Sequence, residues 1–357
     1  MNDSDKHIAK QINPVKMIFP MLIGLGVVGY MMYTEFDIVS FQAINFSYRS
    51  ILFLITALGL MLLRDIGYII RIKILSDARL NYLQATRIIL LWEFTSAVTP
   101  SAIGGTSIAI LFVHKEGIKI GRSSAMVMAT SFLDELYFII MLPLLLIFVN
   151  HTDLWQVAGV SSHVSTSIIW ITIIGYSLKL AYLVFLSYGL FINPKGLRYI
   201  LMQLFRLKVL RTWRKKVNLA GYDIISNSKE LRGQGYLFWL KTFGATFLSW
   251  TSRYWIVNVI LLAFWTTNYD FSSQFLIFAR QLVMWIMMLV SPTPGGSGFA
   301  EYIFKEYLGE FLPSAGLAIA MAMLWRIITY YPYLIIGAFI VPKWIATSFK
   351  QKKKQEK

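Results

Sequence analysis

The chain has 357 residues, of which 57% are hydrophobic, a mean hydropathy of +0.59 and a formal net charge of +16. This composition excludes a water-soluble globular protein, because several apolar runs of about 20 residues are each long enough to cross a bilayer. The sequence contains no cysteine and four histidines, so disulfides, thiolate nucleophiles and a metal centre are not expected. No cofactor is predicted.

The excess of basic residues lies beside apolar segments. Eleven of the 34 Lys and Arg residues fall between Lys195 and Lys241, and a further group closes the chain at 350–357. The positive-inside rule places both groups in the cytoplasm. The expected partner of this charge is therefore the anionic headgroup region of the membrane, and not nucleic acid.

Six apolar segments are predicted to be helices that cross the membrane. In chain order they are 15–33, 50–70, 123–149, 166–190, 238–265 and 315–341. The first is expected to be an uncleaved anchor, since no small-residue cleavage site follows it. The connections 34–49, 150–165 and 266–272 contain one basic residue among them, Arg49, so they are predicted to face outward, with both termini in the cytoplasm.

Two further apolar segments are interrupted by helix-breaking residues. Segment 88–113 is broken at Pro100 and at Gly104-Gly105, which leaves arms of about 12 residues, or roughly 18 Å, too short to cross. Segment 274–310 is broken at four positions, namely Pro292, Pro294, Gly295 and Gly296. Broken helices at membrane depth survive only when they are buried in protein or line a wet cavity. We predict two re-entrant hairpins that enter from opposite faces.

The two halves of the chain repeat the same order of elements. Thirty residues separate Gly104 from Asp134, and thirty also separate Gly296 from Arg326. The predicted architecture is one all-α integral membrane domain, 1–357, with repeat one at 50–149, a basic amphipathic segment at 195–235, an inverted repeat two at 238–341 and a basic tail at 342–357. Inverted repeats of this kind build alternating-access transporters. The alternative is that the glycines and prolines only allow close helix packing.

At its two turns the sequence resembles the flippase-like membrane domain of lysylphosphatidylglycerol synthases, the multiple peptide resistance factors, and their stand-alone relatives. The resemblance rests on Thr99-Pro100 through Gly105, on Pro292 through Gly296, and on Glu301. It implies movement of a lipid with a charged headgroup between leaflets and, in some relatives, of lipid-linked sugars. The chain ends in a lysine tail after the last predicted span, so no synthase domain is expected.

Charged residues inside the predicted spans and hairpin arms are the candidate site, because each is costly at membrane depth unless it is paired or hydrated. They are Arg64, Asp65, Glu93, Asp134, Glu135, Arg253, Arg280 and Arg326. Arg64, Arg253 and Arg326 are predicted to hold a lipid phosphate, for which a guanidinium offers bidentate geometry. The helix ends after Gly105 and Gly296 would add partial positive charge.

The acidic candidates have two interpretations each. Asp134 and Glu135 contact an amine on the headgroup or take up a proton, or else they neutralise Arg326 or Arg253 as structural pairs. Glu93 and Glu301 gate the cavity or form structural hydrogen bonds to the turns. Arg280 is grouped with the substrate-binding residues.

The function predicted from these observations is a non-enzymatic lipid translocase of the inner membrane, acting on an anionic or zwitterionic phospholipid or a polyprenyl phosphate. A membrane-embedded transferase acting on lipid or polyprenyl-linked sugar is the first alternative, and a small-solute or ion transporter is the second. A homo-oligomer and a separate lipid-modifying partner enzyme are left open.

Overall fold

The protein is described by a computed structural model that covers residues 47–99, 102–155, 162–204, 231–264, 270–291 and 293–337, with single residues at 26, 33, 206, 339, 340 and 344. Every regular element within these ranges is helical. Most of the predicted first span, 15–33, most of the basic segment 195–235 and all of the tail 342–357 except Trp344 lie outside the described residues.

Five helices of the described part are long and apolar enough to cross a membrane. They are α4 (Tyr48–Leu75), α7 (Ile120–Phe148), the helix Ser165–Ile192 that contains most of α9 (Ser162–Ser187), α12 (Tyr236–Phe264), and the segment Ala315–Gly337 that begins with α15 (Ala315–Thr329). Five of the six predicted crossings are thereby confirmed as helices of spanning length.

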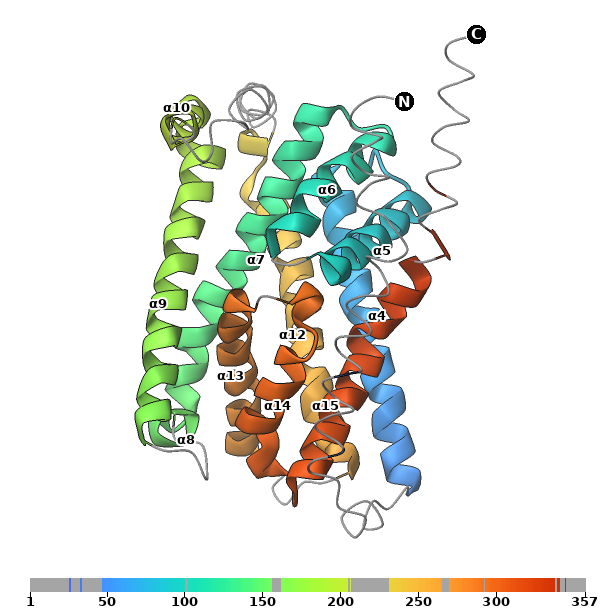
Figure 1. The fold of residues 1–357 in the computed structure, drawn as a ribbon. Helices are drawn as coiled ribbons and strands as arrows, with labels where there is room; N and C mark the ends of the chain where they lie inside the picture. The colour runs from blue at the N-terminus through green and yellow to red at the C-terminus, as the bar shows by residue number, and fades with distance from the viewer. Residues whose placement is uncertain are drawn as a thin grey trace.

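The shorter helices form two pairs. α5 (Tyr82–Val98) and α6 (Ala102–Lys115) make the first, and α13 (Phe271–Met287) and α14 (Phe299–Leu308) make the second. In Figure 1 the first pair occupies the upper half of the molecule and the second pair the lower half, and their turns approach each other at mid-height. The turns are therefore placed at the depth where the long helices have their middles.

Polar caps fix where several of these helices begin. Asn81 accepts from the backbone N–H of Gln84 at 2.8 Å, and Gln84 accepts in return from the N–H of Asn81 at 2.9 Å, which starts α5. Asp270 caps α13 by accepting from the N–H of Ser273. Hydrogen bonds from Ser273 also hold the pKa of Asp270 below its usual value.

The remaining elements sit at the two ends. α8 (His151–Trp155) follows α7 at the lower end of Figure 1, and α10 (Pro194–Leu204) lies across the upper end of α9 after a π-helical turn, Tyr188–Ile192. Single-turn 3₁₀ segments, Met288–Val290, Pro294–Gly296 and Gly309–Phe311, connect the helices of the second pair and its exit.

Close packing of α4 on α12 forms the centre of the fold. A Cβ atom added at Gly67 would lie 2.2 Å from Ser249 Oγ and 2.8 Å from the carbonyl oxygen of Ala245, so only glycine allows this approach. The hydroxyl of Ser249 donates to the carbonyl oxygen of Arg64 at 2.9 Å. Small residues and one interhelical hydrogen bond thus join the first helix of one half to the first helix of the other.

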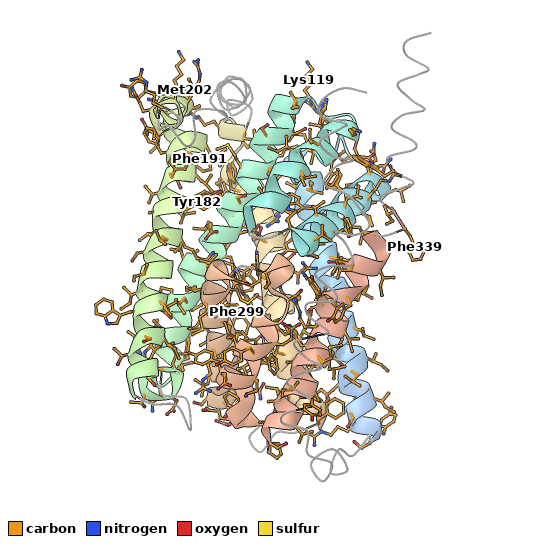
Figure 2. All side chains as sticks on the ribbon, in the orientation of Figure 1. Lys119, Tyr182, Phe191, Met202, Phe299 and Phe339 are labelled. Atoms are coloured by element: carbon orange, nitrogen blue, oxygen red, sulfur yellow. The ribbon has the colours of Figure 1, made fainter. Side chains whose placement is uncertain are left out.

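The outer surface is apolar. Large side chains on α4 and α9 remain exposed, for example Ile55 (60%), Leu62 (65%) and Trp170 (59%). In Figure 2 Phe339 likewise points away from the helices at the edge of the molecule. A band of exposed hydrophobic side chains on long helices is the surface that lipid tails cover.

Candidate functional site

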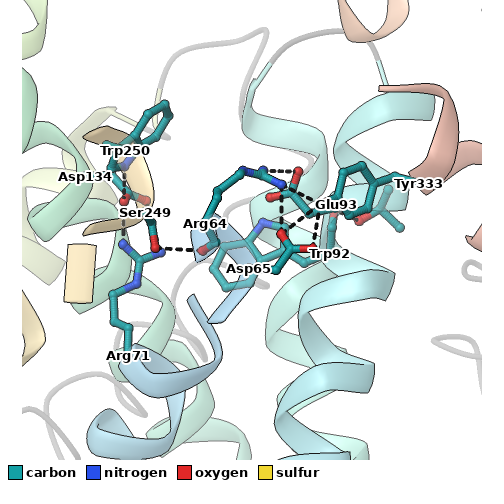
Figure 3. A network of polar contacts seen from close by, with 10 residues as sticks. Arg64, Asp65, Arg71, Trp92, Glu93, Asp134, Ser249, Trp250 and Tyr333 are labelled. Carbon is teal, nitrogen blue, oxygen red and sulfur yellow. Dashed lines mark hydrogen bonds and ion pairs between the residues drawn. The ribbon is translucent and has the colours of Figure 1, made fainter. Parts of the chain in front are cut away.

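A buried ion-pair network joins α4, α5 and the segment after α15 (Figure 3). Arg64 is 1% exposed, and its Nη1 donates to Asp65 Oδ1 at 3.0 Å and to the hydroxyl of Tyr333 at 2.8 Å. Its Nη2 lies 2.5 Å from Glu93 Oε2 on α5. One guanidinium from the first half therefore holds an arm of the first hairpin and a residue of the last span.

The carboxylates are the accessible side of this network. The Asp65 and Glu93 side chains are 21% and 23% exposed, whereas Arg64 behind them is enclosed. The rings of Tyr68 and Tyr333 add cation–π contacts, with the Arg64 Cζ 4.9 and 5.2 Å from the ring centroids. Arg64 is thus neutralised within the protein, and it offers little free charge to a ligand.

A second ion pair lies about two helical turns further along α4. Arg71 Nη1 is 2.5 Å from Asp134 Oδ1 on α7, and it also donates to Thr246 on α12 at 3.2 Å. The indole Nε1 of Trp250 donates to the same carboxylate oxygen at 2.7 Å (Figure 3). Asp134 therefore joins α4, α7 and α12.

The two adjacent acidic residues on α7 form ion pairs with two different helices. Asp134 and Glu135 were expected to pair with Arg326 or Arg253 if they were structural, and the structure gives them different partners. Glu135 Oε2 lies 2.9 Å from Lys179 Nζ on α9. Successive residues of a helix point about 100° apart, so neighbouring carboxylates reach different helices.

An ion pair between Arg326 and Glu301 lies at the second turn. Arg326 Nε donates to Glu301 Oε1 at 3.0 Å, and its Nη2 donates to the carbonyl oxygen of Gly295 at 3.0 Å. The second oxygen of Glu301 accepts from the N–H of Gly298 at 2.8 Å, at the beginning of α14. The helix end predicted to bind a headgroup is occupied by the protein's own carboxylate, and Glu301 makes the structural hydrogen bond that was one of its two interpretations.

The two turns differ from each other in where the chain breaks. Gly295 and Gly296 adopt φ of 58° and 69°, so the second break lies where expected, although Pro292 is outside the described residues and Pro294 opens the short 3₁₀ turn. In the first, α6 already begins at Ala102.

Gly104 and Gly105 therefore belong to the first turn of α6 and do not break a helix, which corrects the predicted position of the interruption. A Cβ on Gly105 would lie 2.3 Å from Ser96 Oγ, so this glycine allows α5 and α6 to pack closely. Pro100 lies outside the described residues.

Arg280 lies away from the other candidates. It is fully enclosed, and its Nη1 donates to the carbonyl oxygen of Tyr307 at 2.9 Å while its Nη2 contacts Glu310 at 2.7 Å and the carbonyl oxygen of Asp153 at 2.5 Å. These groups belong to α8, to α14 and to the 3₁₀ segment Gly309–Phe311 that follows it, at the lower end of Figure 1. The contacts of Arg280 thus tie the base of the second hairpin to α8.

Arg253 stands apart from the other arginines. It lies past the middle of α12, is half-buried, and has its Cζ 4.8 Å from the ring centroid of Trp285 and 5.4 Å from that of Trp250. Within the described part of the chain it has neither a hydrogen bond nor an ion pair to a carboxylate. Its charge still acts at longer range on Asp65 and Glu93.

Sequence reasoning missed several members of these networks. Lys179 lies inside the predicted span 166–190, so the criterion that selected the other charges would also have selected it. Arg71 falls one residue beyond the predicted span 50–70, so that criterion did not select it, yet it is 4% exposed. Tyr330 and Tyr333 carry no formal charge, so the same criterion did not select them, and nothing local in the sequence distinguishes their hydroxyls.

Long apolar helices, with paired charges at their middles, define the chain as a multi-pass helical membrane protein. Its sequence matches the model of the lysylphosphatidylglycerol synthase TM region over residues 17–337, so the chain belongs to this family. The resemblance stated from the two turns is confirmed. The chain is also 27% identical over 282 residues to a UPF0104 membrane protein of Archaeoglobus fulgidus, covering 76% of this chain and 80% of that relative. No solved structure matches it significantly.

Proposed function

We propose that the chain is a non-enzymatic lipid translocase of the cytoplasmic membrane, and that Arg253 binds the phosphate of its cargo. The observation that carries the proposal is the environment of Arg253. It is a half-buried guanidinium on α12 over the rings of Trp250 and Trp285, with no carboxylate at ion-pair distance among the described residues. A cation at this depth is costly unless a counter-charge reaches it, and a phosphate would supply one.

The other two predicted phosphate ligands fit this role less well. Arg64 and Arg326 are 1% and 5% exposed, and each is bound to a glutamate of a hairpin arm. A ligand would have to displace that glutamate and leave it without its cation, at a cost of several kcal/mol where the carboxylate is enclosed, as Glu301 is. Arg253 needs no such exchange, which is why we assign the phosphate to it.

Partly exposed carboxylates on α4, α5 and α7 favour a headgroup that also carries an amine. Asp65, Glu93 and Asp134 are 21%, 23% and 25% exposed. Their arginine partners are enclosed, so the groups presented to a ligand are one guanidinium and several carboxylate oxygens. A zwitterionic lipid matches that distribution better than a lipid with only negative charge.

The arrangement of the helices supports an alternating-access mechanism. The sequence α4, α5–α6, α7 is followed by α12, α13–α14, α15, and the two hairpins approach mid-height from opposite ends (Figure 1). We propose that they are re-entrant hairpins of an inverted repeat with six crossings, the first being 15–33. Basic residues lie at the upper end, for example Lys119 (Figure 2) and Lys195 in α10 (Figure 1), and we assign this end to the cytoplasm together with both termini.

The test is leaflet exchange in liposomes. Purified protein is reconstituted with fluorescent phospholipids of several headgroups, and dithionite quenching measures the fraction of lipid that changes leaflet. Arg253→Ala should lose most of the exchange and Arg253→Lys should retain part of it, because charge survives without the bidentate fork. Lys241→Ala is the matched control, since it removes an exposed cation from the end of the same helix.

The outcomes separate the alternatives. If Arg253→Ala and Lys241→Ala both exchange lipid as the wild type does, Arg253 has no part in the mechanism. If the wild type exchanges no phospholipid, mass spectrometry of copurified lipid decides between a polyprenyl phosphate cargo and a small-solute or ion transporter. A new lipid product that forms only when a soluble donor is added would identify a transferase.

A further inference from the structure

The last span is interrupted at Tyr330. α15 ends at Thr329, Tyr330 has φ −125° and ψ −57°, and helical structure resumes at 331 and continues to Gly337. Pro332 supplies the cause, because it has no N–H to donate to the carbonyl oxygen of Ile328 and its ring crowds that carbonyl, which interrupts the helical ladder one turn earlier. The span therefore consists of two short helical arms joined at one residue.

The lower arm, 315–329, is bound to the second hairpin. Arg326 is paired with Glu301 of α14, as described above. The rings of Trp325 and Phe304 are stacked with their centroids 5.6 Å apart. A buried ion pair and an aromatic stack together hold this arm to α14.

The upper arm, 331–337, is bound to the first hairpin. A Cβ on Gly337 would lie 2.1 Å from the ring of Phe94, so the arm touches α5 directly. Through Tyr333 the arm also joins the Arg64 network, which includes Glu93 of α5. Each arm of the span is thus attached to a different hairpin.

Tyr330, at the joint, touches the turns of both hairpins. Its hydroxyl donates to the carbonyl oxygen of Ala97, at the end of α5, at 3.0 Å, and lies 3.1 Å from Ser297 Oγ in the second turn. A Cβ on Gly295 would lie 2.4 Å from the Tyr330 ring and 2.7 Å from the carbonyl oxygen of Ala97. The cation of Arg326 sits 3.7 Å from the ring centroid.

We infer that the last span is an articulated helix, and that the Tyr330 hydroxyl is a latch that holds the two hairpin turns together. Breaking its bond to Ala97 frees the upper arm with the first hairpin from the lower arm with the second. Two arms that are attached to different hairpins and meet at one non-helical residue have the arrangement of a hinge. The inference deepens the proposed function, because alternating access needs the hairpins to move relative to each other.

The latch is tested by distance measurement without any lipid transport. The sequence has no cysteine, so Leu83→Cys on α5 and Tyr302→Cys on α14 can be spin-labelled alone. Both positions are exposed, at 69% and 50%. Pulsed electron resonance then reports the distance between the hairpins in the full-length protein.

Tyr330→Phe removes only the latch hydroxyl, and Tyr331→Phe is the matched control because the Tyr331 hydroxyl is buried without a hydrogen-bond partner in the described structure. We expect Tyr330→Phe to raise the ratio of the longer-distance to the shorter-distance population roughly two- to tenfold over wild type, as loss of one hydrogen bond would. Tyr331→Phe should leave the ratio unchanged.

Gly295→Ala disturbs the same contact, because its methyl group would press on the Tyr330 ring and the Ala97 carbonyl. It should shift the distance distribution in the same direction, so the latch can still be tested if one of the two variants does not fold. Identical distributions for wild type, Tyr330→Phe and Gly295→Ala would overturn the latch, as would an equal shift in Tyr331→Phe. A shift in Tyr330→Phe, together with no leaflet exchange by the wild type and no copurified polyprenyl phosphate, would keep the latch and reject the proposed function.

Discussion

Tyr333 and Asp65 are 268 positions apart in the chain, and the hydroxyl of Tyr333 lies 2.7 Å from both carboxylate oxygens of Asp65. The same hydroxyl accepts from Arg64, so the tyrosine is a donor and an acceptor at once. A single phenol therefore joins the first described span to the last. It does so where water is scarce and each such bond is expensive to lose.

Tyr333→Phe tests how much these hydrogen bonds contribute to the stability of the protein. The substitution keeps the ring and its cation–π contact with Arg64 but leaves the carboxylate and the guanidinium with one partner fewer. We expect a loss of about 1.5–3 kcal/mol in the free energy of unfolding, the range for hydrogen bonds to charged groups. Unfolding in detergent followed by tryptophan fluorescence measures it, with Tyr331→Phe as the control.

We predict that replacing both Arg326 and Glu301 costs less stability than replacing Arg326 alone. Arg326→Met alone leaves the enclosed Glu301 carboxylate without its cation, and we expect it to cost about 3–5 kcal/mol of stability. The double variant with Glu301→Leu should recover much of that loss, because the buried charge is gone. Equal stabilities of the single and double variants would contradict this account of the pair.

Close contact of α4 with α12 predicts opposite effects for two glycines of one helix. Gly67→Ala would place a methyl group against Ser249 and the backbone of Ala245, so it should lower the thermal midpoint markedly. Gly59→Ala meets nothing within 4 Å and replaces glycine in a helix interior, which should leave the midpoint equal or higher. Thermal unfolding in the same detergent compares the two, and a similar drop in both would refute the packing argument.

Hydropathy was sufficient to predict five of the spans, because lipid imposes a length and composition that a single segment must satisfy alone. The turns were also visible, since proline and the left-handed glycines Gly295 and Gly296 are local signals. The pairing of charges was not, because a partner such as Arg71 for Asp134 depends on the rotation of helices far apart in the chain. Gly104 and Gly105 were wrongly assigned to the first interruption for a similar reason, since they lie inside α6 and Gly105 serves contact with Ser96.

A double-mutant cycle on Arg71 and Asp134 addresses the pairing that the sequence did not reveal. Asp134 accepts from Arg71 and from the Trp250 indole, and it is three-quarters enclosed, so the pair is shielded from solvent. Arg71→Met and Asp134→Leu should each destabilise the protein, and the double variant should lose less than their sum, with a coupling of about 1–3 kcal/mol. The same cycle on Arg71 and Glu135 is the control, because Glu135 is bound to Lys179 on another helix. Coupling that is near zero in the first cycle, or as large in the second, would mean that α7 is oriented by packing and not by this ion pair.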